Sequence, residues 1–200
     1  MTRTLTSMYD TYEAARLTVV DLEAAGILHS DISIVANRYG QVETTEAGSG
    51  AGTGAAIGTA VGGGAGLLAG LGMLAIPGVG PVVAAGWLAA TLAGAVVGAG
   101  AGAVSGGIIG AMTSSGVDEA HANVYAEGVR RGGAFVTARV PDQQAPAAEA
   151  IMQRHSPIDP DVRGRAYRED GWTAFDGAAR PYTADEIERE RARYIRDHVA

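Results

Sequence analysis

Few residues in this chain have the type and spacing that chemistry requires, and the closest approach to a metal site is a short acidic stretch. Asp118 and Glu119 are followed by His121, while the other three histidines are scattered along the chain. Divalent cations need several carboxylate or imidazole groups that converge. The competing interpretation is the start of a helix with an exposed histidine, and we favour it. We therefore expect no metal site and no catalytic residue.

Nucleotide chemistry is equally weakly supported. Gly64–Ala69 matches the loose pattern GxGxxA, but this pattern binds a dinucleotide only between a strand and a later acidic residue, and neither is expected here. The chain has no Cys and no Lys, which excludes disulfides, thiolate nucleophiles and Schiff-base chemistry. The net charge of −7 disfavours a nucleic-acid partner. We expect no cofactor and identify no small-molecule substrate.

Two adjacent arginines, Arg130 and Arg131, are the remaining candidates for a contact. Guanidinium groups bind phosphate and anionic lipid headgroups. The alternative is a pair of solvated arginines at a helix C-terminus, where the helix dipole favours cations. Their position beyond a long apolar segment, mirrored by Arg38 before it, fits residues on the cytoplasmic side of a membrane.

The element that dominates the sequence is this apolar segment, because residues 47–117 carry no charge. Its small residues recur every four positions, which places them on one face of a helix. The first series is Gly54, Gly58, Gly62, Gly66 and Gly70, and the second includes Gly94, Gly98, Gly102, Gly106 and Gly110. Stripes of this kind let helices pack closely in a bilayer, so we interpret both as helix-packing surfaces.

A break in the middle divides the segment into two arms. It contains Pro77, Gly78, Gly80 and Pro81, which no helix tolerates together. The arms, residues 54–76 and 82–112, each supply the roughly 20 residues that span a bilayer. The sequence thus predicts a transmembrane helical hairpin. A flexible linker, or a hairpin buried inside an oligomer, would be the alternatives.

The flanking regions have the order of a small α/β domain. Residues 1–40 predict a strand, a helix with Asp10 as its cap, and a second strand. After the apolar segment, we expect a helix that starts at Asp118, a strand at residues 134–140, a further helix, and a short last strand that begins at Val162. This is the order of a ferredoxin-like βαββαβ fold, an α+β class with the hairpin inserted. The predicted divisions are residues 1–46, 47–117, 118–164 and a polar tail, 165–200, with a helix over 183–198.

Several of these stretches resemble the bacterial general stress proteins (17M-like), also called low-temperature-induced proteins. The matching pieces are residues 31–37, the turn at 76–81, and residues 124–133 leading into the strand at Phe135. The resemblance covers about residues 2–160 and implies a small α/β domain with a glycine-zipper hairpin and a link to stress. It implies no catalytic residue.

These observations predict a non-enzymatic, stress-associated integral membrane protein that binds lipid and self-assembles through its glycine-zipper helices. Since no leader follows Arg3, the hairpin would lie in the bacterial inner membrane with both termini cytoplasmic. One alternative is a channel or pore-like oligomer. Another is a soluble oligomeric regulatory module whose hairpin is buried in protein.

Overall fold

The computed structural model describes residues 1–38, 71–76, 78–98 and 106–197. In this part of the chain, five strands form one antiparallel sheet in the order β1-β5-β2-β4-β3. Their bounds are β1 Thr2–Tyr9, β2 Ile32–Asn37, β3 Gly72–Ile76, β4 Gly80–Gly86 and β5 Ala134–Pro141. The α+β class predicted from the sequence is confirmed.

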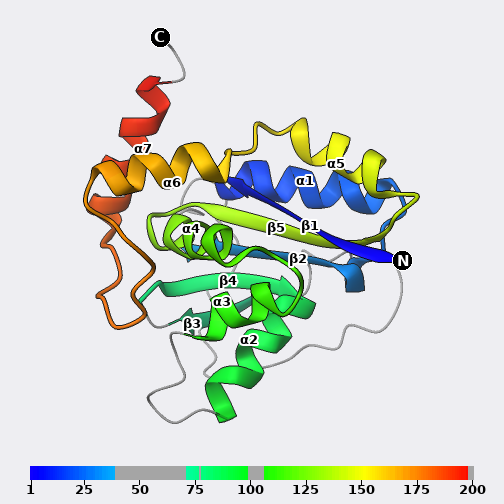
Figure 1. The fold of residues 1–200 in the computed structure, drawn as a ribbon, viewed down its shortest axis with the longest axis horizontal. Helices are drawn as coiled ribbons and strands as arrows, with labels where there is room; N and C mark the ends of the chain where they lie inside the picture. Colours follow the sequence, from blue (N-terminus) through cyan, green and yellow to red (C-terminus); the bar gives the residue numbers. More distant parts are fainter. Residues whose placement is uncertain (39–70, 77, 99–105, 198–200) are drawn as a thin grey trace, which may run out of the picture.

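Helices cover both faces of this sheet (Figure 1). One face carries α1 (Tyr12–Ala24) and α5 (Ala145–Gln153), and the other carries α2 (Trp87–Gly98), α3 (Gly106–Thr113) and α4 (Glu119–Arg130). A short helix, η1 (His29–Asp31), precedes β2, and α6 (Pro160–Glu169) and α7 (Ala184–Asp197) follow α5. Because strand side chains alternate, Phe135 of β5 joins the core on the α4 face and Val136 joins the core on the α1 face.

Local sequence signals explain where most of these elements begin. The Asp118 carboxylate accepts hydrogen bonds from the amides of Ala120 and His121, so it caps α4 as predicted. The second strand predicted within residues 1–40 and the strand predicted at residues 134–140 are present as β2 and β5. Helix α1 differs by one residue from the prediction, because its cap is Thr11, whose hydroxyl accepts from the Ala14 amide at 3.2 Å.

The predicted ferredoxin-like arrangement is not what the structure shows. Strands β1 and β2 lie on either side of β5, and α1 connects them, as in a split β-α-β unit. The last strand predicted at Val162 is wrong, since Val162 lies in α6. Asp159 caps this helix, and its carboxylate accepts a hydrogen bond from the Val162 amide. Only Ile158 reaches the sheet, through an isolated bridge to Met8. The sheet instead gains β3 and β4 from the predicted hairpin.

The transmembrane hairpin is also wrong where the structure describes it. The turn at Gly78 and Gly80 joins two antiparallel strands, not two helices, and the Val79 amide donates to the Ile76 carbonyl at 3.0 Å. No helix in the described ranges is long and apolar enough to cross a membrane. The integral membrane function, the transmembrane-helix assignment and the inner-membrane location with cytoplasmic termini are therefore contradicted. The pore-like alternative depended on the same spans.

The glycine stripes are only partly within the described residues. The series from Gly54 to Gly70 lies outside them, as do Gly102 and Pro77. Gly94 and Gly98 belong to α2, and Gly106 begins α3. At Gly110 an added Cβ would meet no described atom within 4 Å. Helices α2 and α3 do pack against each other, but the role of the stripes stays a prediction.

Candidate functional site

The strongest concentration of polar interactions lies where α7 crosses the end of α4 and the side of α6 (Figure 1). We call the surface under α7 the α7 groove. It is formed by five residues on three segments: Arg131, Gly132, Arg163, Tyr167 and Asp170. The first two follow α4, the next two belong to α6, and the last is the residue after α6.

The apolar contact of the α7 groove is a close fit between Ile187 and Gly132. Gly132 has φ +102°, and a Cβ placed there would lie 2.2 Å from Cγ2 of Ile187. The side chain of Ile187 is 1% exposed. A Cβ at position 132 would therefore require Ile187 to shift, and the left-handed backbone of this residue favours glycine as well.

Beside this contact, a chain of ion pairs connects α7 to α4. Nη1 of Arg131 donates to Oε1 of Glu190 at 2.6 Å, and its Nε donates to Oε1 of Glu127 at 2.7 Å. Glu127 is fully buried and also accepts from Arg130. Burial works against the charge of Arg131, but the hydrogen bonds to Glu190 and Glu127 outweigh it and raise the pKa of Arg131. The guanidinium group also stacks over the Tyr167 ring, 4.2 Å from its centre.

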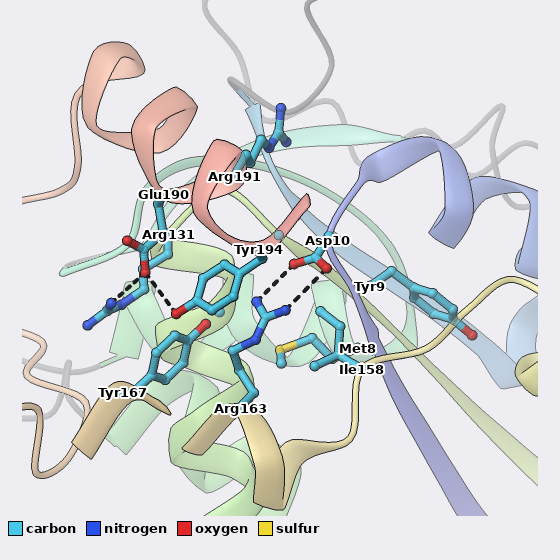
Figure 2. A pocket seen from close by; sticks show the side chains of 12 residues that line it. Met8, Tyr9, Asp10, Arg131, Ile158, Arg163, Tyr167, Glu190, Arg191 and Tyr194 are labelled. Atoms are coloured by element: carbon cyan, nitrogen blue, oxygen red, sulfur yellow. Dashed lines mark hydrogen bonds and ion pairs between the residues drawn. The ribbon is translucent and has the colours of Figure 1, made fainter. Parts of the chain in front are cut away.

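A second arginine holds the other end of the groove (Figure 2). Arg163 makes two hydrogen bonds to the Asp10 carboxylate, at 2.8 and 3.1 Å, and its guanidinium lies 3.7 Å from the centre of the Tyr194 ring. The Tyr194 hydroxyl donates to Glu190 at 3.3 Å. Burial, followed by the nearby charge of Glu190, raises the pKa of Tyr194 to about 12.

Two further contacts fix the direction of α7. Nη2 of Arg191 donates to the Gly132 carbonyl at 2.6 Å. Arg193 makes two hydrogen bonds to Asp170, one of them at 2.8 Å. At its N-terminus, Thr183 and Glu186 form a capping box, since the Glu186 amide donates to the Thr183 hydroxyl and the Glu186 carboxylate accepts from the Thr183 amide.

The space that these side chains enclose is small. The pocket between α7, α6 and the end of β1 has a volume of about 10 Å³, room for roughly one water molecule. With α7 in place, the pocket is too small for an organic substrate. What the site can do in this arrangement is hold a helix.

The structure places the predicted site residues in two groups. Arg130 and Arg131 lie at the groove, with side chains 15% and 9% exposed and paired to Glu127, so a lipid headgroup would have to compete with that carboxylate. The lipid contact stays untested. The turn residues Gly78, Gly80 and Pro81 lie at the β3–β4 connection instead. No three potential metal ligands converge within the described ranges.

Sequence reasoning missed Asp10, Arg163 and Glu190 as partners in one site. Their contacts join residues more than 50 positions apart, and no local pattern specifies such pairing. Two features of the sequence are consistent with a contact between the end of α4 and the tail helix. One was the Gly132-Gly133 pair after α4, and the other was the narrow apolar edge of the tail helix, which includes Ile187 and Tyr194.

Comparison with protein-family models, with curated proteins and with solved structures found no match.

Proposed function

We propose that this chain is a non-enzymatic regulatory module that binds an amphipathic helix with a carboxylate facing Arg131 in the α7 groove, with α7 as the resident occupant. The observation that carries this proposal is the spacing of the α7 anchors. Ile187, Glu190 and Tyr194 are separated by three and four residues, so they share one helix face, and each meets a different part of the groove. Helix-in-groove recognition uses the same spacing.

The ion pairs of the groove support an occupant with a carboxylate beside Arg131. Without α7, the guanidinium groups of Arg130, Arg131 and Arg163 would face the carboxylates of Glu127, Asp10 and Asp170. Arg131 would then share Glu127 with Arg130, which favours a helix that supplies a second carboxylate where Glu190 now lies. A helix with a cation at that position would be disfavoured.

The interface is also of a kind that allows exchange. Glu190, Arg191 and Arg193 contact the groove through hydrogen bonds and ion pairs, and the Arg193–Asp170 pair is partly exposed. Partly exposed pairs contribute about 1 kcal/mol or less. A competing helix must still overcome an effective concentration of α7 that is on the order of millimolar for a tethered segment.

The test is the binding of a labelled peptide with the sequence of residues 182–197, followed by fluorescence anisotropy. In full-length Glu190→Arg, the new cation would face Arg131, and we expect like-charge repulsion to drive α7 out of the groove. We therefore expect this variant to bind the native peptide at least about tenfold more tightly than the wild-type chain, in which α7 blocks the groove.

The matched control is Glu188→Arg, which makes the same charge change on the exposed side of α7. It should bind the peptide no better than the wild type. Equal peptide affinity in both variants, with both folded by circular dichroism, would contradict the groove as a recognition site.

The resemblance to general stress proteins supports a regulatory role during stress, and this role is part of the proposal. The split β-α-β core, with Ile158 bridging to Met8, supports a distant relation to the ferredoxin-like order, also as a proposal.

A further inference from the structure

The two edges of the sheet differ in how they are protected. At the β1 edge, Ile158 bridges to Met8 and donates its amide to the Met8 carbonyl at 2.7 Å, and Arg3 places a charge further along the strand, where it pairs with Glu149. Charges and covering loops are the usual means by which proteins prevent strand addition. The β1 edge therefore has two such means.

The β3 edge has neither of these among the described residues. β3 has the sequence Gly-Met-Leu-Ala-Ile, carries no charge and pairs on one side with β4. The Met73 side chain is 62% exposed, and Ala75 is exposed beside it. In an antiparallel pair, alternate backbone N–H and C=O groups point away from the partner strand, so β3 directs such groups outward.

We propose that the β3 edge is a self-association surface, which pairs antiparallel with β3 of a second copy across a two-fold axis. A two-fold arrangement requires the strand to be complementary to itself. All five residues pair only when the axis passes through Leu74. This register places Met73 opposite Ala75 of the second copy, so a large exposed side chain meets a small one.

The size of the surface sets the expected strength. A stable dimer usually buries about 800 Å² on each partner, more than one five-residue strand provides. We therefore expect reversible association with a dissociation constant in the micromolar range or weaker. Lengthening the sheet across the axis leaves the α7 groove untouched, so this inference does not depend on the proposed function.

The register gives a direct test, because the chain has no native cysteine. In Leu74→Cys, the two thiols would face each other across the axis. Directly opposite residues have Cα atoms about 4.5–5.5 Å apart, which a disulfide can bridge. We expect mild oxidation to give a covalent dimer on a non-reducing gel at least about tenfold faster than in Leu28→Cys, since pairing raises the effective thiol concentration.

Leu28→Cys is the matched control, because Leu28 is 64% exposed and precedes η1 rather than belonging to β3, so it reports random collisions. Equal cross-linking rates in the two variants would overturn the inference. A second measurement uses sedimentation equilibrium of Met73→Lys against Leu28→Lys. Loss of the dimer in Met73→Lys but not in Leu28→Lys supports the edge contact. A dimer that survives Met73→Lys overturns it, and so does a wild-type chain that is monomeric at all concentrations. The peptide experiment on α7 is unaffected by either result.

Discussion

At the scale of single residues, two glycines at the end of α4 determine what can lie beside them. At Gly133, an added Cβ would approach the Tyr9 and Gly128 carbonyl oxygens at 3.0 Å, so β1 and α4 come together there. At Gly132, the neighbour is Ile187 of α7. Residues 128–133 therefore form the surface where β1, α4 and α7 meet.

Gly132→Ala should destabilise the protein more than a left-handed backbone alone explains. Gly26 provides the control, because its φ is +86° and an added Cβ would meet nothing within 4 Å. We expect Gly26→Ala to cost about 1–2 kcal/mol from backbone conformation alone. Gly132→Ala should cost more, since its Cβ also collides with Ile187.

Urea unfolding measures both free energies. In an Ile187→Ala background the collision is absent. Gly132→Ala should therefore cost less stability there than in the wild type, close to the cost of Gly26→Ala. If the two single glycine variants lose the same stability, the close fit between Gly132 and Ile187 is not a constraint on α7.

At the scale of elements, α7 depends on its neighbours for stability more than on its own sequence. Its surface is polar, and its contacts with the groove include the Tyr194 ring, which lies between Arg163 and Glu190. A helix of this kind is stabilised by packing of one narrow face. Ionisation of Tyr194 at that face would therefore affect docking.

The pKa of Tyr194 predicts how docking changes with pH. Burial raises this pKa from 10.0 to about 12, so between these values the unfolded chain loses a proton that the folded chain keeps. The stabilisation is complete below pH 10 and is lost as the pH rises through about 12. At pH 11 the loss from this group is about 1 kcal/mol.

Urea midpoints at pH 9 and pH 11 test this expectation. The wild type should lose more stability between them than Tyr194→Phe, which has no proton to release at that position. The pKa of Tyr125 is also raised to about 12, by burial, and this residue contributes equally to both chains. The same pH dependence in both proteins would contradict a protected hydroxyl at position 194.

Some elements could be predicted from the sequence, and others could not. The strand at residues 134–140 and the Asp118 cap depend on local signals, namely β propensity and a carboxylate before a helix, and both were correct. The helical arms predicted over residues 54–76 and 82–112 are wrong at 72–76 and 82–86, because the glycine series that end at Gly70 and begin at Gly86 suggest helices, whereas Val82 and Val83 also suit a fully buried strand. Periodicity does not separate a short apolar strand from a helix.

At the scale of the whole molecule, the sheet separates two hydrophobic cores, and β5 lies between β1 and β2 with both faces covered. Such a strand opens only when most of the fold opens. Helix α7, in contrast, contributes no strand to the sheet, so we expect it to leave the groove while the sheet stays intact. The molecule should therefore have at least two levels of opening.

Hydrogen exchange measured by mass spectrometry tests this hierarchy. Amides in peptides covering residues 134–141 should exchange slowest, and those of α7 should exchange faster, because its opening breaks few apolar contacts. Glu190→Arg should accelerate exchange in α7 and leave β5 unchanged. Protection of α7 equal to that of β5 would mean that the helix does not open separately.

The segment that precedes α7, residues 176–181, contacts the turn between β3 and β4. An added Cβ at Gly78 would lie 2.6 Å from the Asp176 carbonyl oxygen, and one at Gly80 would lie 2.8 Å from Cβ of Pro181. The chain just ahead of the last helix is thus pressed against the bend that joins β3 to β4. Shortening the protein from its C-terminus past Asp176 would loosen that bend too, and a change made at one extremity would be felt at the outermost strand.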